Sequence, residues 1–269
     1  MVFIRQSTDV PRLNAYLLSS FPHEELEPLK RAFELGTAAP FATMLELVIR
    51  RAPADYEGKS HEYMRREEDK AGREGPFIVI DSRGAGGRDG AVWYVDRFAD
   101  EDEVEEGIAE STDMVWKIPV KTECLALKYV NYDALNISLQ EDLGHLGVEE
   151  PLNQGYEFPT ADDCAGLDML EQRASKYAHA VAVPGEFEES TEKSLRENMR
   201  PEPAKVARLK GAVAEAAGLV SDWTFCSEAL PERLPDGAKK TFPEGSIILL
   251  ATYNPNFGWP EYKWPEGSL

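Results

Sequence analysis

Carboxylate and aromatic side chains at the ends of predicted strands are the groups in this chain most able to do chemistry. Asp81 and Asp96 each end a short apolar stretch, and Tyr94 lies two residues before Asp96. A carboxyl group can exchange a proton with a bound molecule, and a nearby phenol can orient that molecule. We therefore expect Asp81, Asp96 and Tyr94 to be the catalytic residues of an enzyme.

The two aspartates are not expected to act as a pair. The connection between their stretches is too short for a parallel crossover, so an antiparallel hairpin is predicted. Asp81 then lies at the turn end and Asp96 five residues away at the far end, which is roughly 17 Å in an extended strand. Each carboxylate would act alone, or Asp96 would instead form an ion pair with Arg97 at the sheet edge.

A polar cluster that follows the fourth predicted strand contains Asn131, Asp133 and Asn136. Such side chains commonly bond the local backbone in turns. At a strand end they can also orient a ligand at the mouth of a pocket. On this second interpretation we expect the three residues to bind the substrate, together with Trp93 and Trp259.

No motif for a cofactor or a metal is found. The glycines of Ser82–Gly90 lack the dinucleotide spacing and lead into a strand, so they favour a hairpin loop over a phosphate loop. The four histidines are not spaced as a metal pair. The acidic run Asp100–Asp113 lacks the alternating acids around a glycine that a calcium loop needs, and a short exposed helix is predicted there. We expect no cofactor and no metal.

The charge and the cysteines limit the partners and the compartment. The net charge of −20 comes without a basic footprint, which argues against binding to nucleic acid or to an anionic membrane surface. A small-molecule substrate or a basic protein partner is compatible with it. The three cysteines are odd in number and widely spaced, and no stretch has a signal peptide's or a membrane span's apolar length. A cytoplasmic protein is predicted.

An α+β fold is predicted from the distribution of β-branched and aromatic residues. Short stretches rich in Val, Ile, Trp and Tyr indicate a mostly antiparallel sheet. The predicted strands lie near residues 77–81, 91–96, 115–120, 125–130 and 246–252. Because the last strand would complete the sheet of residues 76–143, one compact domain over residues 1–269 is expected.

Helices are predicted on both sides of the sheet segment. Residues 1–75 should be mainly helical, with helices at 10–18, at 24–35 ending at Gly36, and from 38 to 52. Residues 160–220 should form further helices, at 161–183, 188–198 and 203–219. The aromatic tail that follows the last strand, within residues 246–269, is expected to pack across the body of the protein.

The stretch Val115–Leu143 resembles a motif of microbial proteins, many of them from filamentous fungi. In that motif a strand pair is followed by a turn with two spaced asparagines, which here are Asn131 and Asn136. Ile137 and Leu139 depart from the Met and the aromatic residue expected there. The resemblance extends from Phe77 to Leu143 and implies the sheet and a cytosolic setting, but no particular reaction.

Two classes of function agree with these features. The first is a cofactor-independent enzyme, of the cyclase, isomerase, lyase or hydrolase type, that uses acid/base catalysis on a small organic molecule. The alternative is a non-catalytic binding protein that presents the acidic segment Asp100–Asp113 to a basic partner, or the aromatic tail to an apolar one.

Overall fold

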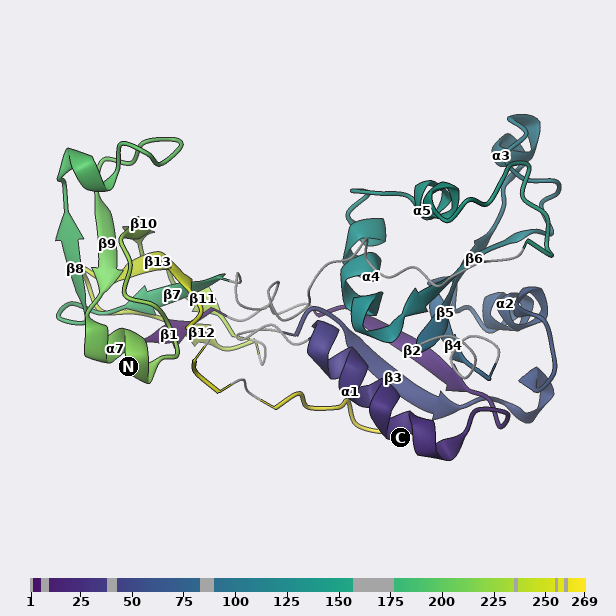
Figure 1. Cartoon of the computed structure of the whole chain (residues 1–269). Helices are drawn as coiled ribbons and strands as arrows, with labels where there is room; N and C mark the ends of the chain where they lie inside the picture. The colour runs from purple at the N-terminus through teal and green to yellow at the C-terminus, as the bar shows by residue number, and fades with distance from the viewer. Residues whose placement is uncertain are drawn as a thin grey trace. The chain divides into compact units, whose positions relative to one another are not determined.

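The computed structural model describes two compact units, and each is considered by itself (Figure 1). The mixed-sheet unit contains Pro11–Thr37, Met44–Leu167 and Lys263–Leu269, and the antiparallel-sheet unit contains Met1–Val10, Ala38–Thr43 and Asp168–Tyr262. Within them the structure describes residues 2–5, 10–37, 43–82, 90–156, 177–234, 237–254, 256–258 and 261–269.

The mixed-sheet unit is built on a five-stranded sheet with the order β3-β2-β4-β5-β6. Strand β2 lies parallel to β3 and β4, whereas β4, β5 and β6 follow one another in antiparallel pairs. The strands are β2 (Arg12–Leu17), β3 (Glu46–Arg51), β4 (Phe77–Ile80), β5 (Ala91–Phe98) and β6 (Val115–Lys121). Tyr94 faces Ile78 across the β4–β5 hairpin, which confirms the predicted antiparallel pairing.

Helices cover both faces of this sheet. Because side chains alternate along a strand, Val95 packs with Met64 of α2 on one face, whereas the ring of Tyr94 lies 5.3 Å from that of Tyr132 in α4 on the other. The α-helices of this unit are α1 (Leu26–Thr37), α2 (His61–Lys70), α3 (Glu101–Glu105), α4 (Leu125–Asp133) and α5 (Leu139–His145). Short 3-10 helices are η1 (His23–Glu25), η2 (Ala54–Tyr56) and η3 (Thr122–Cys124).

The antiparallel-sheet unit contains a six-stranded sheet with the order β1-β7-β13-β10-β9-β8, and a separate β11-β12 hairpin. Its core is rich in alanine, and Leu209, Leu219 and Leu249 pack with those alanines near α7. The strands are β1 (Phe3–Ile4), β7 (Tyr177–Ala182), β8 (Phe187–Ser190), β9 (Val206–Leu209), β10 (Thr224–Glu228), β11 (Glu232–Arg233), β12 (Lys239–Lys240) and β13 (Ile247–Thr252). The helices are η5 (Lys193–Leu195) and α7 (Gly211–Ala216).

The α+β class is confirmed, but several N-terminal elements were predicted wrongly. The segments expected as helices at 10–18 and 38–52 contain strands β2 and β3 instead, and only the helix predicted at 24–35 is found, as η1 and α1. β2 is paired on both sides by parallel neighbours, and Leu13, Ala15 and Tyr16 are buried while Asn14 and Leu17 are half-buried, so it lacks the strict alternation of a strand with one exposed face. Helix α2 also lies within residues 1–75, which were expected to be mainly helical.

The segment 125–130 was predicted as a strand but lies in helix α4. Over nine residues, periodicity does not separate a strand from a helix, and Leu, Ala and Lys favour the helix here. The helices predicted within 160–220 are also mostly wrong. Residues 177–182, 187–190 and 206–209 form strands, whereas residues 157–176 lie outside the described part of the chain.

The strand predicted at 246–252 exists as β13, but it does not join the sheet of β4 and β5. It pairs with β7 and β10 in the antiparallel-sheet unit. The prediction of one compact domain was based on β13 joining that sheet. Since β13 pairs elsewhere, this reason for a single domain no longer holds.

The last residues of the chain pack on the mixed-sheet unit, as expected for part of the aromatic tail. The Trp264 ring lies 5.6 Å from the ring of Phe33, and its Nε1 donates to Glu34 at 2.7 Å. The backbone N–H of Leu269 donates to Ile49 O at 2.9 Å. Because β3 is an edge strand, this segment covers backbone groups that would otherwise be exposed.

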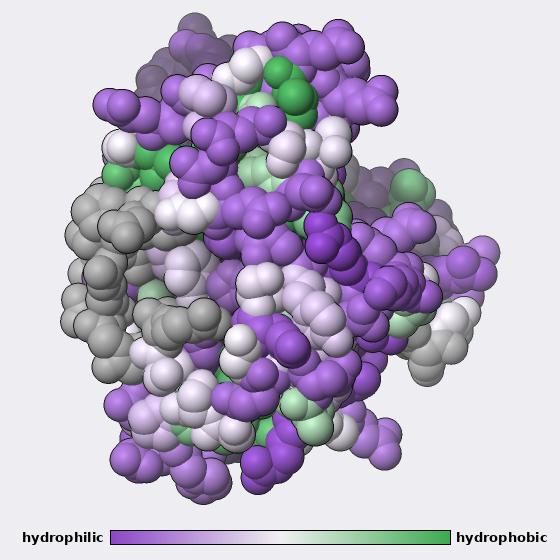
Figure 2. All heavy atoms as spheres, turned by 90° about the vertical axis from the view of Figure 1, so that its right-hand side faces the viewer, coloured by the Kyte–Doolittle hydropathy of each residue, from purple (hydrophilic) through white to green (hydrophobic). Residues whose placement is uncertain are grey.

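The surface and the cysteines bear on the compartment. The face turned toward the viewer in Figure 2 is largely hydrophilic, with a few separate hydrophobic patches, and no helix among the described residues is long and apolar enough to span a bilayer. Cys124 is disulfide-bonded, and Cys226 is a free thiol. The odd number and wide spacing of the cysteines did not predict this disulfide.

Candidate functional site

A β-bulge in β5 creates the most chemically distinctive surface of the mixed-sheet unit. Val95 pairs with Lys117 and Phe98 pairs with Val115, so Asp96 and Arg97 together oppose the single residue Trp116. In a regular strand Asp96 and Arg97 would point to opposite faces. The extra residue re-aims the side chains, and both residues line the same pocket with Trp116.

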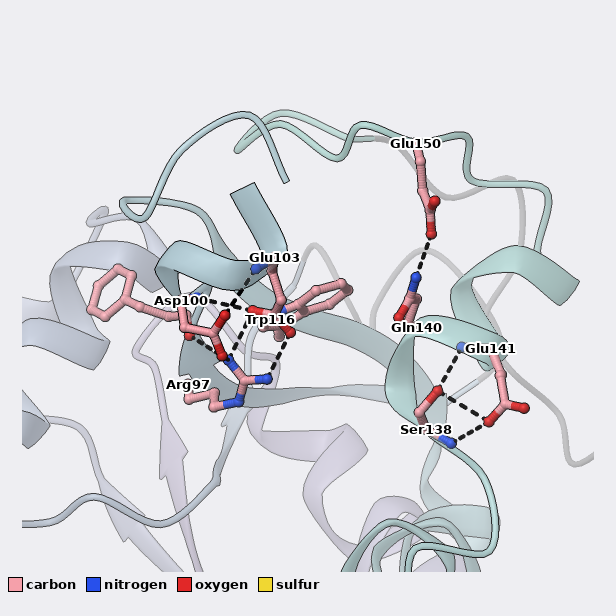
Figure 3. Close-up of polar contacts among 9 residues, drawn as sticks. Arg97, Asp100, Glu103, Trp116, Ser138, Gln140, Glu141 and Glu150 are labelled. Carbon is pink, nitrogen blue, oxygen red and sulfur yellow. Dashed lines mark hydrogen bonds and ion pairs between the residues drawn. The ribbon is translucent and has the colours of Figure 1, made fainter. Parts of the chain in front are cut away.

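Glu103 of α3 holds Arg97 at this bulge (Figure 3). The guanidinium donates to both carboxylate oxygens, at 2.9 Å and 2.7 Å. Trp116 Nε1 donates to Glu103 at 3.1 Å, and the backbone N–H of Asp100 donates at 2.9 Å as part of a capping box. Burial alone would raise the pKa of Glu103, but these hydrogen bonds hold that pKa below its ordinary value.

The opposite wall of the pocket is the connection between α4 and α5. Ser138 caps α5, accepting from the backbone N–H of Glu141 at 3.1 Å, while the Glu141 carboxylate accepts from the backbone N–H of Ser138 at 2.6 Å. In Figure 3 this cap faces the cluster around Arg97 and Glu103. The wall also contains Tyr132, Leu135 and residues 137–141.

A buried ionic network fixes this wall to α4. Asp142 is 4% exposed and accepts from Lys128 Nζ at 2.7 Å and from the Tyr132 hydroxyl at 2.6 Å. Removing one partner of such a buried pair leaves the other charge uncompensated, which makes the arrangement costly to disrupt. The connection between α4 and α5 is thus held by Lys128 and Tyr132 on its α4 side and by Asp142 on its α5 side.

The two walls enclose a pocket of about 320 Å³. Small-molecule sites begin at about 300 Å³, so the pocket has the volume for a small organic ligand. One side is charged, from Asp96, Arg97 and Glu103, and the other presents apolar side chains, from Leu135, Ile137 and Leu139.

Asp96 is the carboxyl group of this pocket with the most unusual environment. Burial raises the pKa of Asp96 above its ordinary value, and the positive charges of Arg97 and Arg65 offset this only in part. The expected Asp96–Arg97 ion pair is not formed, since Arg97 binds Glu103 and Asp100. Among the described residues, the backbone N–H of Arg97 is the one donor to the Asp96 carboxyl group.

Tyr94 lies behind Asp96, on the same face of β5 and against Tyr132. It is 3% exposed and does not line the pocket. Burial, followed by the negative charge of Asp96, raises the pKa of the Tyr94 phenol. Its catalytic role stays a prediction, and the structure gives it no direct access to a ligand in this pocket.

Asp81 lies at the other end of the β4–β5 hairpin from Asp96, as predicted. Its side chain is 1% exposed at the end of β4. Trp93 points to the face opposite Asp96, where its ring lies 4.9 Å from that of His61. The structure therefore does not bring Asp81 or Trp93 together with Asp96 in one site.

The polar cluster that follows the predicted fourth strand belongs to the end of α4. Asn136 donates through its backbone N–H to Asn131 O at 2.9 Å, and the two side-chain amides are 3.5 Å apart. This is the local turn bonding considered from the sequence. Asn131, Asp133 and Asn136 do not line the pocket, and Trp259 lies outside the described residues.

Several pocket residues were missed by the sequence analysis, namely Arg97, Glu103, Trp116, Tyr132, Ser138 and Glu141. The spacings Asp100–Glu103 and Ser138–Glu141 match the capping-box pattern and could have located both helix starts. The β-bulge that gathers Asp96 and Arg97 has no comparable signal, because it depends on the register of β6.

Within the described ranges, no cluster of three His, Cys, Asp or Glu side chains could hold a metal ion. The fold and the pocket define an α+β protein with an acidic pocket of small-molecule size. Comparison with known proteins adds no relative: no family model matches the chain, and no curated protein or solved structure matches it. The resemblance of residues 77–143 to the fungal and other microbial proteins stays a prediction.

Proposed function

We propose that this protein is an enzyme that acts on a small organic molecule in the bulge pocket, with Asp96 as its acid/base residue. The observation that carries the proposal is the Asp96 carboxyl group, which lines the pocket while burial raises its pKa. A carboxyl group that lines a cavity and whose pKa is raised by burial is a candidate for proton transfer.

The two pocket carboxyl groups of β5 and α3 have opposite environments. The pKa of Asp96 is raised by burial, whereas hydrogen bonds overcome the effect of burial and lower that of Glu103. Such a separation is typical of sites in which two neighbouring carboxyl groups have different roles. Glu103 is occupied by Arg97, Trp116 and Asp100, so its role here is to fix Arg97 and the pocket wall.

The test compares turnover by Asp96→Asn and by a matched control, Asp102→Asn. Asp102 is an exposed acid of α3 outside the pocket. A mixture of small metabolites is incubated with each protein, and consumption is followed by mass spectrometry. We expect the wild type and Asp102→Asn to consume the same compound and Asp96→Asn to lose at least about 100-fold in rate. Equal consumption by all three proteins would contradict the role of Asp96.

A second candidate, a non-catalytic protein that binds a basic partner, is favoured by the surface of α3. Glu101, Asp102, Glu105 and Glu106 are exposed, and no ion pair to them is found within the described ranges. Wild-type protein that consumes no compound would favour this function. Binding of a basic protein that weakens steeply as salt rises would support it directly.

The cytoplasmic location expected from the sequence stays a prediction. The disulfide of Cys124 weighs against it, because stable disulfides are uncommon in reducing compartments. Labelling of the free thiols in protein isolated under acid quench would decide the redox state of Cys124 in the cell.

A further inference from the structure

The ionisable groups that line the bulge pocket leave it with an excess of negative charge. Asp96, Glu103 and Glu141 are three carboxyl groups, and Arg97 is the one cation in the lining. Arg97 is already committed, since it binds both oxygens of Glu103 and also lies 3.4 Å from Asp100. An anionic ligand would therefore find no spare cation among the residues that line this pocket.

The carboxyl groups differ in how much hydrogen-bonding capacity remains for a ligand. Glu103 accepts from Arg97, Trp116 and the backbone of Asp100. Asp96 accepts from the backbone N–H of Arg97, and in the described part of the chain no other donor reaches it. A carboxylate can accept about four hydrogen bonds. Asp96 therefore retains acceptor positions for donors on a bound molecule.

The wall opposite Asp96 is apolar and exposed. Leu135 is 90% exposed and adopts a φ of 55°, a left-handed conformation that is uncommon for a residue other than glycine. It lies with Ile137 and Leu139 at the α4–α5 side of the pocket. An apolar group of the ligand would cover this surface and remove it from water.

From this combination we infer that the ligand of the bulge pocket is an amphipathic cation, with a protonated nitrogen facing Asp96 and an alkyl or aryl group against Leu135. The inference rests on the proposed function for the location of the site, and it adds the chemical class of the substrate. A charge-assisted hydrogen bond between an ammonium group and a carboxylate gives the preference over neutral ligands. The guanidinium of Arg97 already binds the Glu103 carboxylate, so the pocket disfavours anionic ligands.

The test uses three probes of similar shape: 2-phenylethylammonium, neutral 2-phenylethanol and anionic phenylacetate. Binding to the full chain is measured by ligand-observed NMR and by calorimetry at neutral pH. We expect the ammonium probe to bind about five to ten times more tightly than the alcohol, and phenylacetate to bind most weakly. Asp96→Asn should bring the ammonium and alcohol affinities together, whereas Asp102→Asn should leave their ratio unchanged.

A second variant tests the apolar wall without disturbing the fold. Leu135→Asn suits the left-handed conformation better than leucine does, so its stability should not fall. It should weaken the ammonium and alcohol probes by a similar factor of about two to five, because both lose the same apolar contact. Unchanged affinity for both probes would contradict contact with Leu135.

The outcomes separate this inference from the proposed function. An alcohol or carboxylate that binds as tightly as the ammonium probe would overturn the cationic class, even where Asp96→Asn abolishes turnover. An ammonium preference that disappears in Asp96→Asn, with turnover unaffected by that substitution, would support the class and reject catalysis by Asp96. Absence of binding by all three probes at about 10 mM would overturn the inference, since even weak site-specific ligands reach millimolar affinity.

Discussion

Replacing Gly36 by alanine should destabilise the mixed-sheet unit, although alanine is the better helix former. Gly36 lies near the end of α1 and was predicted to stop that helix, but the helix continues to Thr37 and Gly36 is buried. A Cβ atom at Gly36 would lie 1.7 Å from the backbone oxygen of Glu123 in η3. The glycine is needed here for close packing between α1 and η3.

The size of the effect follows from that distance. An ordinary contact of a Cβ atom begins at 3.4 Å, so the Glu123 backbone would have to retreat by about 1.7 Å. Overpacking of a buried contact costs about 1–3 kcal/mol, and we take the upper end, about 3 kcal/mol, because a backbone atom cannot rotate away as a side chain can. The helix-propensity gain of alanine offsets up to about 1 kcal/mol of this. We expect a net loss of about 2 kcal/mol.

The assay is calorimetric unfolding of the full chain, with Gly144→Ala as the matched control. Gly144 is also helical, in α5, but a Cβ atom there has no neighbour within 4 Å. A loss of 2 kcal/mol should lower Tm by about 4–8 °C in Gly36→Ala, whereas Gly144→Ala should leave Tm unchanged or raise it slightly. A Gly36→Ala protein as stable as the wild type would refute the close-packing argument.

Two further substitutions test interactions in the mixed-sheet unit. Glu68 is 2% exposed and accepts from Tyr16, Tyr56 and Arg73, so Glu68→Gln should cost about 1.5–3 kcal/mol at pH 7. Burial alone would raise the pKa of Glu68, but those bonds hold it below its ordinary 4.5 in the folded protein. The stabilisation is therefore complete above pH 4.5 and is lost as the pH falls through the lowered value. A Tm difference between wild type and variant that does not shrink in acid would contradict this assignment. Trp264→Phe keeps the ring against Phe33 but loses the bond to Glu34, so denaturant titration should show a loss of about 1 kcal/mol. Trp264→Ala should lose more, because it also removes the ring contact with Phe33; an unchanged stability of Trp264→Phe would show that the indole N–H contributes nothing.

Part of the candidate site followed from local sequence patterns. The placement of Asp81 and Asp96 at opposite ends of a hairpin was correct, because a short connection permits only antiparallel pairing and strand length then sets the separation. The helix at Asp100–Asp113 was also correct and is found as α3. The roles of Asp96 and the other candidate residues stay predictions.

Apart from the two capping boxes, Asp100–Glu103 and Ser138–Glu141, the arrangement of the pocket could not be predicted from local patterns, for two physical reasons. The bulge at Asp96 and Arg97 is a one-residue offset between β5 and β6, and an offset in pairing is a property of two strands together. The wall from Tyr132 to Glu141 depends on α4 being a helix, and periodicity over its nine residues does not separate a helix from a strand.

The sequence by itself determined the α+β class, the positions of strands β4, β5, β6 and β13, and the acidic surface. These features depend on composition and on the local alternation of apolar and polar residues, and both can be read from neighbouring residues alone. Only the tertiary structure decided that β2 and β3 are parallel strands, that β13 pairs with β7 and β10, and that Asp96 shares a pocket with Glu103 and Trp116. These features depend on pairing and packing between distant segments, and their free energy appears only when those segments meet.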